Sequence, residues 1–395
     1  MSDITLSRVF NAYPRAVARV MEGGDRGFYI PAYQRPYAWS SRDIERLMIS
    51  VVEGVGALEE MDDAITFIGT FIFINDKDYT TVEPQVRNDL PTGVYLVIDG
   101  QQRLTTMALL AIALHQQLHA LGSYLVGHKS MAGDAAAWVE PQLSEVSANL
   151  VALFTARQGY GQPPYNHYPR IIRAYEDSWS QKPEHAQYES PVAHLVWQYI
   201  QHMQADPAQS FDYTPPDGAE SHHADFAARF RYTVARLKKV VEEKYQSTES
   251  DERLPDLAHL LDVAQGDRGL LERFFRFRVP EAVADIWRLD AELTLPQRRL
   301  REFSRLIMFA RYMLGRLAVT EVTVDKEEYA FDMFEALNTT GEPLTAFETF
   351  RPAVIRNEDL KDFKSSPSAE YLKHVEAFLA RQGDRRRQRC NEVMI

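Results

Sequence analysis

The segment 94–106 constrains the fold of this 395-residue chain more than any other. Its apolar, β-branched run at 94–98 is typical of a buried strand, and Asp99 and Gly100 interrupt that run. The spacing of apolar residues from 101 to about 121 then predicts a helix. The polar sequence Asp-Gly-Gln-Gln-Arg therefore falls on a strand-to-helix turn.

Such a turn is suited to binding a phosphate group. A helix start offers unpaired backbone N–H groups and the positive end of the helix dipole. Gly100 lets a ligand approach the backbone, and Arg103 can bind a phosphate through two nitrogens. A second interpretation involves no ligand: Asp99 only caps the helix and Gly100 only forms the turn. The glutamines Gln101 and Gln102 are then solvated, and the residues alone leave both interpretations open.

A second cluster of functional residue types follows a short predicted strand at 28–31. Its two prolines stiffen the loop, so that the geometry of the loop is set before any ligand arrives. Aromatic, amide and guanidinium groups that can stack on bases or bind phosphates lie there, namely Tyr33, Gln34, Arg35, Tyr37 and Trp39. Tyr37 and Trp39 also fit as core aromatics. We favour the core for Trp39 and a ligand contact for Gln34 and Arg35.

The pattern of predicted elements changes near residue 125. Residues 1–125 mix helices and strands, whereas residues 126–395 show mainly helical periodicity. Helices are predicted at 6–21, 40–55 (with a serine, Ser40 or Ser41, as N-cap), 101–121, 135–156, 168–179, 191–203, 224–244, 256–264, 270–277, 280–289, 295–316, 326–337 and 346–356. Strands are predicted at 28–31, 66–74, 94–98 and 319–324. We therefore predict an α+β protein, with a small mixed α/β domain at 1–125 and a larger helical domain at 126–395.

Composition narrows the class of protein. The single cysteine, Cys390, excludes an internal disulfide and fits a reducing cytoplasm. The N-terminus lacks a basic-then-apolar export signal, and no apolar run of about 20 residues predicts a membrane span. A net charge of −12 argues against bulk binding of nucleic acid but leaves room for a local basic groove. The arginines at 298–305 and 385–389 are interpreted as solvated helix faces.

Three motifs occur in an order that resembles a known family. They are Ile-Pro-x-Tyr-Gln-Arg-x-Tyr-x-Trp at 30–39, Ile-Gly-Thr at 68–70 and Ile-Asp-Gly-Gln-Gln-Arg-Leu-Thr-Thr at 98–106. The set resembles domain-of-unknown-function family 262. This is the ParB/sulfiredoxin-like N-terminal domain of GmrSD-type modification-dependent (type IV) restriction enzymes and of the phosphorothioate-sensing defence protein SspE. The resemblance implies a ParB/sulfiredoxin-like fold for the N-terminal α/β domain.

Weaker similarities extend the resemblance over about residues 5–360. The segment 338–344 resembles the family's Asn-x-x-Gly-x-x-Leu element, and Arg170 and Asp177 resemble a family position. The 338–344 segment also has a local explanation, because it ends one predicted helix and a capping box opens the next. That explanation does not account for Asn338.

The resemblance implies hydrolysis of a nucleotide at the Asp-Gly-Gln-Gln-Arg turn, coupled to DNA cleavage in phage defence. Carried over by position, the catalytic residues are Asp99, Gln101, Gln102 and Arg103, and the nucleotide-binding residues are Gly100, Gln101, Arg103, Thr105 and Asn338. The expected cofactors are Mg²⁺ and GTP or ATP. Asp99 would hold Mg²⁺ or orient the attacking water, and Arg103 would neutralise developing charge. Tyr33, Gln34 and Arg35 would either complete this pocket or read modified DNA.

The chain departs from many relatives after residue 360, where no His-Asn-His nuclease motif is found and His374 is the only histidine. Any cutting step would belong to a missing C-terminal domain, a partner subunit or an unrecognised site. The expected partners are modified DNA and a His-Asn-His nuclease; a homo-oligomer is left open. Two alternatives also stay open: a non-catalytic sensor of phosphorothioate or glycosylated-cytosine DNA, and a ParB-like nuclease in its own right.

Overall fold

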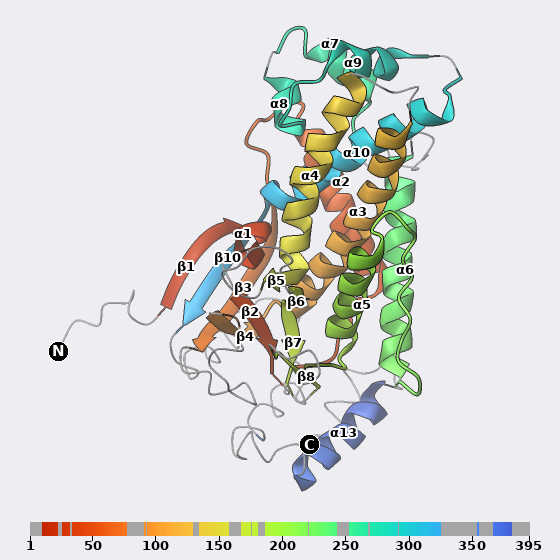
Figure 1. The fold of residues 1–395 in the computed structure, drawn as a ribbon. Helices are drawn as coiled ribbons and strands as arrows, with labels where there is room; N and C mark the ends of the chain where they lie inside the picture. The colour runs from red at the N-terminus through yellow and green to blue at the C-terminus, as the bar shows by residue number, and fades with distance from the viewer. Residues whose placement is uncertain are drawn as a thin grey trace, which may run out of the picture.

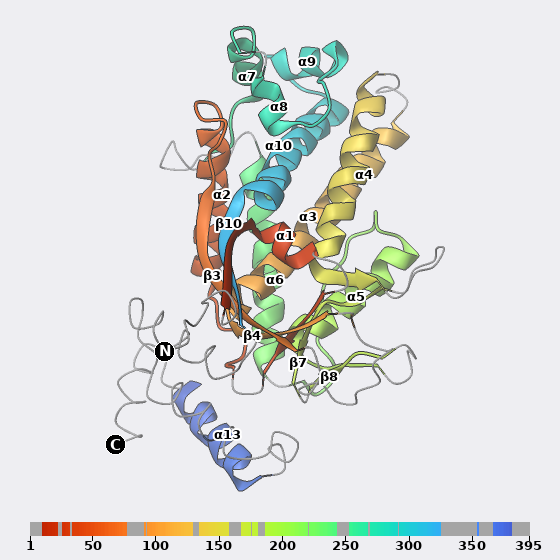
Figure 2. The ribbon, with the colours of Figure 1, turned by 90° about the vertical axis from the view of Figure 1, so that its left-hand side faces the viewer.

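The computed structural model describes most of the chain, namely residues 10–22, 26–31, 34–76, 91, 93–128, 134–157, 167–174, 176–180, 186–219, 221–242, 253–267, 269–290, 292–324, 354 and 366–380. Most helices stand above and beside a small mixed sheet, and α13 (Pro367–Ala380) lies below the sheet, which gives an elongated molecule (Figures 1 and 2). The predicted α+β class is confirmed.

Six strands form the main sheet, in the order β1-β10-β3-β4-β2-β7. Their bounds are β1 (Phe10–Ala16), β2 (Arg26–Ile30), β3 (Thr66–Asp76), β4 (Gly93–Asp99), β7 (Ile171–Arg173) and β10 (Leu317–Val324). β1 runs antiparallel to β10 and β3 antiparallel to β4, while the other neighbours are parallel. Two small antiparallel pairs are β5 (Thr155–Arg157) with β6 (His167–Pro169) and β8 (Asp177–Ser178) with β9 (Gln187–Tyr188).

The helices lie mainly where the apolar spacing predicts them. Their bounds are α1 (Val17–Glu22), α2 (Ser41–Ala57), α3 (Gln101–Gly127), α4 (Asp134–Phe154), α5 (Pro191–Ala205), α6 (Ser221–Val241), α7 (Leu257–Val263), α8 (Leu270–Phe274), α9 (Glu281–Arg288), α10 (Leu295–Arg316) and α13 (Pro367–Ala380). Ser40 caps α2 as predicted, in a reciprocal pair of hydrogen bonds with Asp43. The helices predicted at 326–337 and 346–356 lie almost entirely outside the described residues.

Helix α3 is the central helix of the protein. By length and composition it could cross a membrane, yet 83% of its apolar window is buried inside the protein. It packs against α4, α6 and α10, and nearly all of its residues from Gln101 to Leu118 are buried. Its apolar character therefore serves the core of the protein.

Two of the predicted helices contain strands in the structure, although residues 17–21 of the first, predicted at 6–21, are helical in α1. Residues 10–16, within the helix predicted at 6–21, form β1 because they pair with β10, about 300 residues away. Residues 168–179 also form short strands, of which β7 pairs with β2. Their apolar spacing fits a helix, but pairing with a distant strand overrides the local preference.

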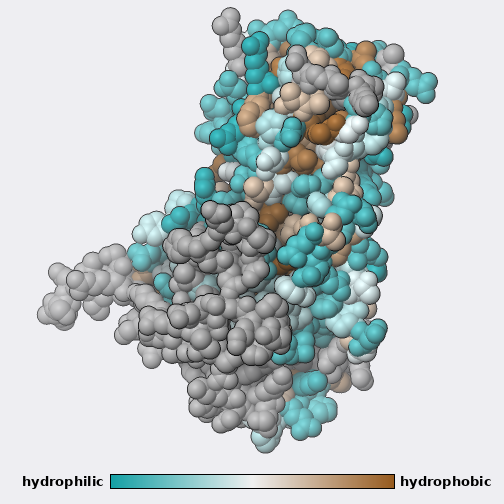
Figure 3. Space-filling model, viewed as in Figure 1, coloured by the Kyte–Doolittle hydropathy of each residue, from teal (hydrophilic) through white to brown (hydrophobic). Residues whose placement is uncertain are grey.

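Both faces of the sheet are covered by apolar side chains. Phe28, Phe71 and Phe73 face the main core beneath the helices, whereas Ile72 and Leu96 face a smaller cluster that includes Trp179 and Tyr188. The main core takes residues from both sides of position 125, and so does the sheet. The predicted domain boundary at 125 stays a prediction. In the view of Figure 3 the surface is mostly hydrophilic where it is described, with hydrophobic patches around the upper helices.

Two arginines of the cluster at 298–305 have structural roles, whereas Arg298 and Arg299 are exposed. Arg301 donates hydrogen bonds to the carbonyls of Ile286, Trp287 and Leu289, and so holds the end of α9 against α10. Arg305 is buried. The interpretation of this cluster as a solvated helix face is therefore wrong for these two arginines.

Candidate functional site

Three parallel strands end at the same edge of the sheet. β4, β2 and β7 are neighbours and run in the same direction, so the residues at their carboxyl ends lie together. These residues are the turn at Asp99 and Gly100, the loop 34–40 and Arg173, the last residue of β7. Ligands of open α/β sheets bind outside the carboxyl ends of the strands, which makes this edge the candidate site.

The turn requires glycine for two reasons. Gly100 has a left-handed backbone with φ of 98°, and a Cβ atom there would lie 2.2 Å from a ring carbon of Phe71. Gly100 is the N-cap residue of α3, so the interpretation of Asp99 as the N-cap is wrong. Because glycine brings no capping side chain, the first N–H groups of α3 can bind an anion.

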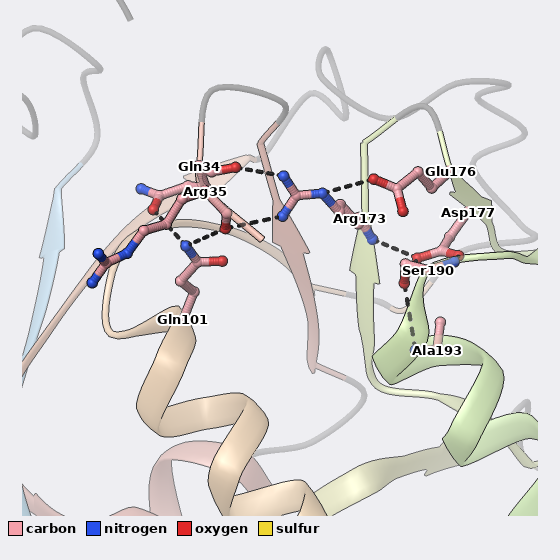
Figure 4. Close-up of polar contacts among 8 residues, drawn as sticks. All are labelled: Gln34, Arg35, Gln101, Arg173, Glu176, Asp177, Ser190 and Ala193. Carbon is pink, nitrogen blue, oxygen red and sulfur yellow. Dashed lines mark hydrogen bonds and ion pairs between the residues drawn. The ribbon is translucent and has the colours of Figure 1, made fainter. Parts of the chain in front are cut away.

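Gln101 connects the turn to the 34–40 loop. Its Nε2 donates to Oε1 of Gln34 at 3.0 Å and to the carbonyl oxygen of Arg35 at 2.8 Å (Figure 4). Gln34 in turn donates from Nε2 to the carbonyl oxygen of Ile98 at 2.6 Å. The two sequence motifs, far apart along the chain, therefore form one hydrogen-bonded unit.

Gln102 holds the second half of the loop. Its Oε1 accepts the successive N–H groups of Ala38 and Trp39 at 2.8 and 3.2 Å, and its Nε2 donates to the carbonyl of Pro36 at 3.2 Å. Both glutamines are buried, at 6% and 8% exposed, so the solvated interpretation of Gln101 and Gln102 is wrong. Their amide groups order the loop before a ligand arrives.

Charged groups surround the turn. Asp99 Oδ2 lies 3.8 Å from Nη1 of Arg103, which also donates to the carbonyl of Thr70 at 2.6 Å. The Arg103 guanidinium lies against Gly69, where a Cβ atom would be 3.1 Å from Cζ. Burial raises the pKa of Asp99 above its ordinary value, although the positive charges of Arg103 and Arg35 oppose this effect. The partly buried carboxylate of Asp99 thus interacts with the positive charges of two arginines.

The turn at Asp99 and Gly100 offers a metal ion a single carboxylate, that of Asp99. Among the residues that the structure describes, no three His, Cys, Asp or Glu side chains are grouped so that they could hold a metal ion. Mg²⁺ is often bound by one or two carboxylates together with water and the phosphates of a substrate. Asp99 therefore fits Mg²⁺ only as one ligand beside a phosphate group.

The other predicted site residues differ in position. Thr105 is 3% exposed, within the buried part of α3. The Tyr37 hydroxyl lies 2.8 Å from Oγ1 of Thr106, and its ring meets Phe226 edge-on at 5.4 Å. Tyr37 and Trp39 both pack against the main core, as the core interpretation predicts. Tyr33 and Asn338 lie outside the described residues.

A group that sequence reasoning missed lies next to the loop (Figure 4). The Arg173 guanidinium donates to the carbonyls of Gln34 and Arg35 and pairs with Glu176 at 2.8 Å. No local pattern marks Arg173, because its role depends on the pairing of β7 with β2. Arg170, which resembles a family position more weakly, is buried and donates a hydrogen bond to the carbonyl of Arg26.

Asp177 is buried behind Arg173. Its carboxylate accepts hydrogen bonds from the N–H of Arg173 at 2.7 Å and from both the N–H and the hydroxyl of Ser190, at 2.8 and 2.5 Å. Burial raises the pKa of Asp177 to about 7, although these hydrogen bonds act in the opposite direction. Ser190 is the N-cap of α5, so Asp177 ties β7 to the start of a helix.

Comparison with known proteins gives a family. No curated protein matches the sequence. Residues 17–355 match the family described as "GmrSD restriction endonuclease, N-terminal domain". The match covers most of the chain, including the turn, the loop and Arg173. The chain therefore belongs to the family of the GmrSD restriction endonuclease N-terminal domain.

Proposed function

We propose that this chain is the nucleotide-hydrolysing, DNA-sensing component of an anti-phage restriction system that acts on modified DNA. Family membership supports a role in restriction. The observation that carries the proposal is the joining of the two motifs, because Gln101 bonds to Gln34 and Arg35 beside an uncapped helix start. A phosphate ligand fits there, with the charges of Arg103 and Arg35 nearby.

Each residue of the turn has a role in this proposal. Gly100 lets the ligand approach the backbone, the N–H groups of Gln101 and Gln102 bind phosphate oxygens, and Arg103 stabilises the charge that develops on the transferred phosphoryl group. Asp99 accepts a hydrogen bond from the attacking water and orients it. Mg²⁺, with Asp99 as its protein ligand, would supply charge neutralisation at the phosphates. Gln101 and Gln102 hold the loop in place and so position Arg35.

The test is a phosphate-release assay with the purified protein, Mg²⁺ and either GTP or ATP. We expect Asp99→Ala to lower kcat about 100-fold or more, as loss of a group acting on the transition state does. Asp285→Ala is the matched control, because Asp285 also pairs with an arginine at short spacing but lies on α9, at the far end of the molecule (Figure 1). Equal phosphate release by the wild type and Asp99→Ala would show that the turn is not the hydrolytic site.

A second candidate is a non-catalytic sensor of modified DNA. It is favoured by the exposure of the Arg35 side chain on a loop whose backbone is already held by three buried side chains, those of Gln101, Gln102 and Arg173. A gel-shift assay at one salt concentration compares phosphorothioate, glycosylated-cytosine and unmodified duplexes. We expect the wild type to prefer one modified duplex and Arg35→Ala to lose that preference. Arg42→Ala, an exposed arginine of α2, is the control. Equal affinity of the wild type for all three duplexes would exclude the hypothesis that the protein senses a specific modification.

A further inference from the structure

Arg173 makes a two-pronged contact with the backbone of the site loop. Its Nη2 donates to the carbonyl of Gln34 at 2.5 Å and its Nη1 to the carbonyl of Arg35 at 3.4 Å. Nε of Arg173 lies 2.8 Å from Oε1 of Glu176, and the arginine side chain is only 11% exposed. A planar guanidinium can span two carbonyls in this way because its N–H groups point in fixed directions.

This contact constrains the backbone from which the side chain of Arg35 leaves the loop. Two successive carbonyls face Arg173, so the peptide between Gln34 and Arg35 cannot turn over without losing hydrogen bonds. Gln101 fixes the same carbonyl of Arg35 from the other side, at 2.8 Å. The Arg35 side chain consequently leaves the loop in the direction away from Arg173 (Figure 4).

Arg173 is itself anchored from behind. Its backbone N–H donates to Asp177, whose carboxylate also accepts two hydrogen bonds from Ser190 at the start of α5. Its neighbour in the sheet is Ile30, the last residue of β2 before the loop. The start of a helix, a strand end and the site loop are therefore joined through one arginine.

We propose that Arg173 is a positioning residue that orients Arg35 toward the ligand, and that Asp177 and Ser190 hold Arg173 in place. The effect on ligand binding rests on the proposed function, because Arg35 must touch nucleotide or DNA for its orientation to matter. The effect on the loop does not depend on any activity.

Hydrogen–deuterium exchange of the full chain tests the effect on the loop. Arg173→Lys keeps the charge but cannot span two carbonyls in the same way. We expect exchange of the amides at 34–40 to become about ten-fold faster or more, as the loop opens locally. The matched control is Arg273→Lys, because Arg273 also donates to two successive carbonyls, those of Leu58 and Glu59, and pairs with Asp267. The control should leave 34–40 unchanged, and unchanged exchange there in Arg173→Lys overturns the proposal.

Ser190→Ala provides a second variant, in which the guanidinium is intact but Asp177 loses the hydroxyl. We expect faster exchange both at the start of α5 and at 34–40. A change confined to α5 would show that the Asp177–Ser190 pair does not act on the loop. This variant also keeps the inference testable if Arg173→Lys fails to fold.

A double-mutant cycle tests the effect on ligand binding. The dissociation constants of Mg²⁺–GTP, Mg²⁺–ATP and duplex DNA are measured for Arg35→Ala, Arg173→Lys and the double variant. If Arg173 acts through Arg35, the double variant binds no more weakly than Arg35→Ala alone. Additive losses show that Arg173 does not act through Arg35. A wild type that binds neither nucleotide nor DNA refutes the proposed function instead, and the exchange experiment still decides the role of Arg173.

Discussion

At the level of single residues, the site depends on buried side chains that hold the loop 34–40 in place. Gln101 and Gln102 lie at the helix start, where polar residues usually meet solvent, yet both are buried against the 34–40 loop. Asp99 and Arg103 keep partly exposed side chains, at 29% and 27%. The turn thus separates residues that shape the site from residues that can meet a ligand.

Gly100 is the residue for which substitution has the clearest expected cost. Gly100→Ala places a Cβ atom against Phe71 in a left-handed backbone, so we expect the free energy of unfolding to fall by about 2 kcal/mol or more. Gly56→Ala is the control, because no atom lies within 4 Å of a Cβ at Gly56 in α2. It should be neutral or stabilise by up to about 1 kcal/mol. Denaturant unfolding measures both, and equal stability of the two variants would contradict the strain at the turn.

At the level of secondary-structure elements, α3 serves both site and core. Its first turn forms the site, while its middle packs against α5 through His115, whose Nδ1 lies 2.7 Å from the Tyr199 hydroxyl. Burial, together with His119 and His202, lowers the pKa of His115 to about 3. The imidazole is therefore neutral in the folded protein over the whole physiological range.

The buried histidine predicts instability in acid. In the unfolded chain His115 takes up a proton near pH 6.5, but in the folded protein it does so only near pH 3. The free energy of unfolding therefore falls as the pH is lowered between these two values. His115→Gln keeps a hydrogen-bonding group but does not titrate. We expect the free energy of unfolding of the wild type to fall more steeply than that of His115→Gln between pH 7 and pH 4. Parallel curves would contradict the lowered pKa.

At the level of the whole molecule, strands from distant parts of the chain complete one sheet. β10 lies between β1 and β3, and β7 flanks β2 at the other edge. A fragment ending near residue 130 would lack both strands, leaving β1 without its neighbour in the described sheet.

We therefore expect the fragment 1–130 not to fold cooperatively, because the missing strands leave sheet edges and apolar faces exposed. Thermal unfolding followed by circular dichroism compares it with the full chain. A fragment ending after residue 324, which retains β7 and β10, is the control. A cooperative transition in the 1–130 fragment would support an independent domain with a boundary at 125.

Local sequence was sufficient to predict those helices and strands whose residue types match the structure that the element adopts in the fold. The β-branched run at 94–98, the serine cap at Ser40 and the apolar spacing at 295–316 each predict the observed element. Prediction was wrong at 10–16, where β1 pairs with β10, and at 168–179, where β7 pairs with β2 and the short strands β6 and β8 pair with β5 and β9. Short-range propensity carries no information on a partner hundreds of residues away.

For the site, the sequence by itself determined the strand-to-helix turn and its glycine, because a tight turn from a strand into a helix requires particular residue types at that point. The two sequence motifs also identified the two segments that meet at the site. Long-range packing decided that the glutamines turn inward, that Asp99 is not the helix cap, and that Arg173 holds the loop. These features follow from which strands become neighbours at the carboxyl edge of the sheet, and that choice depends on the burial of the whole chain.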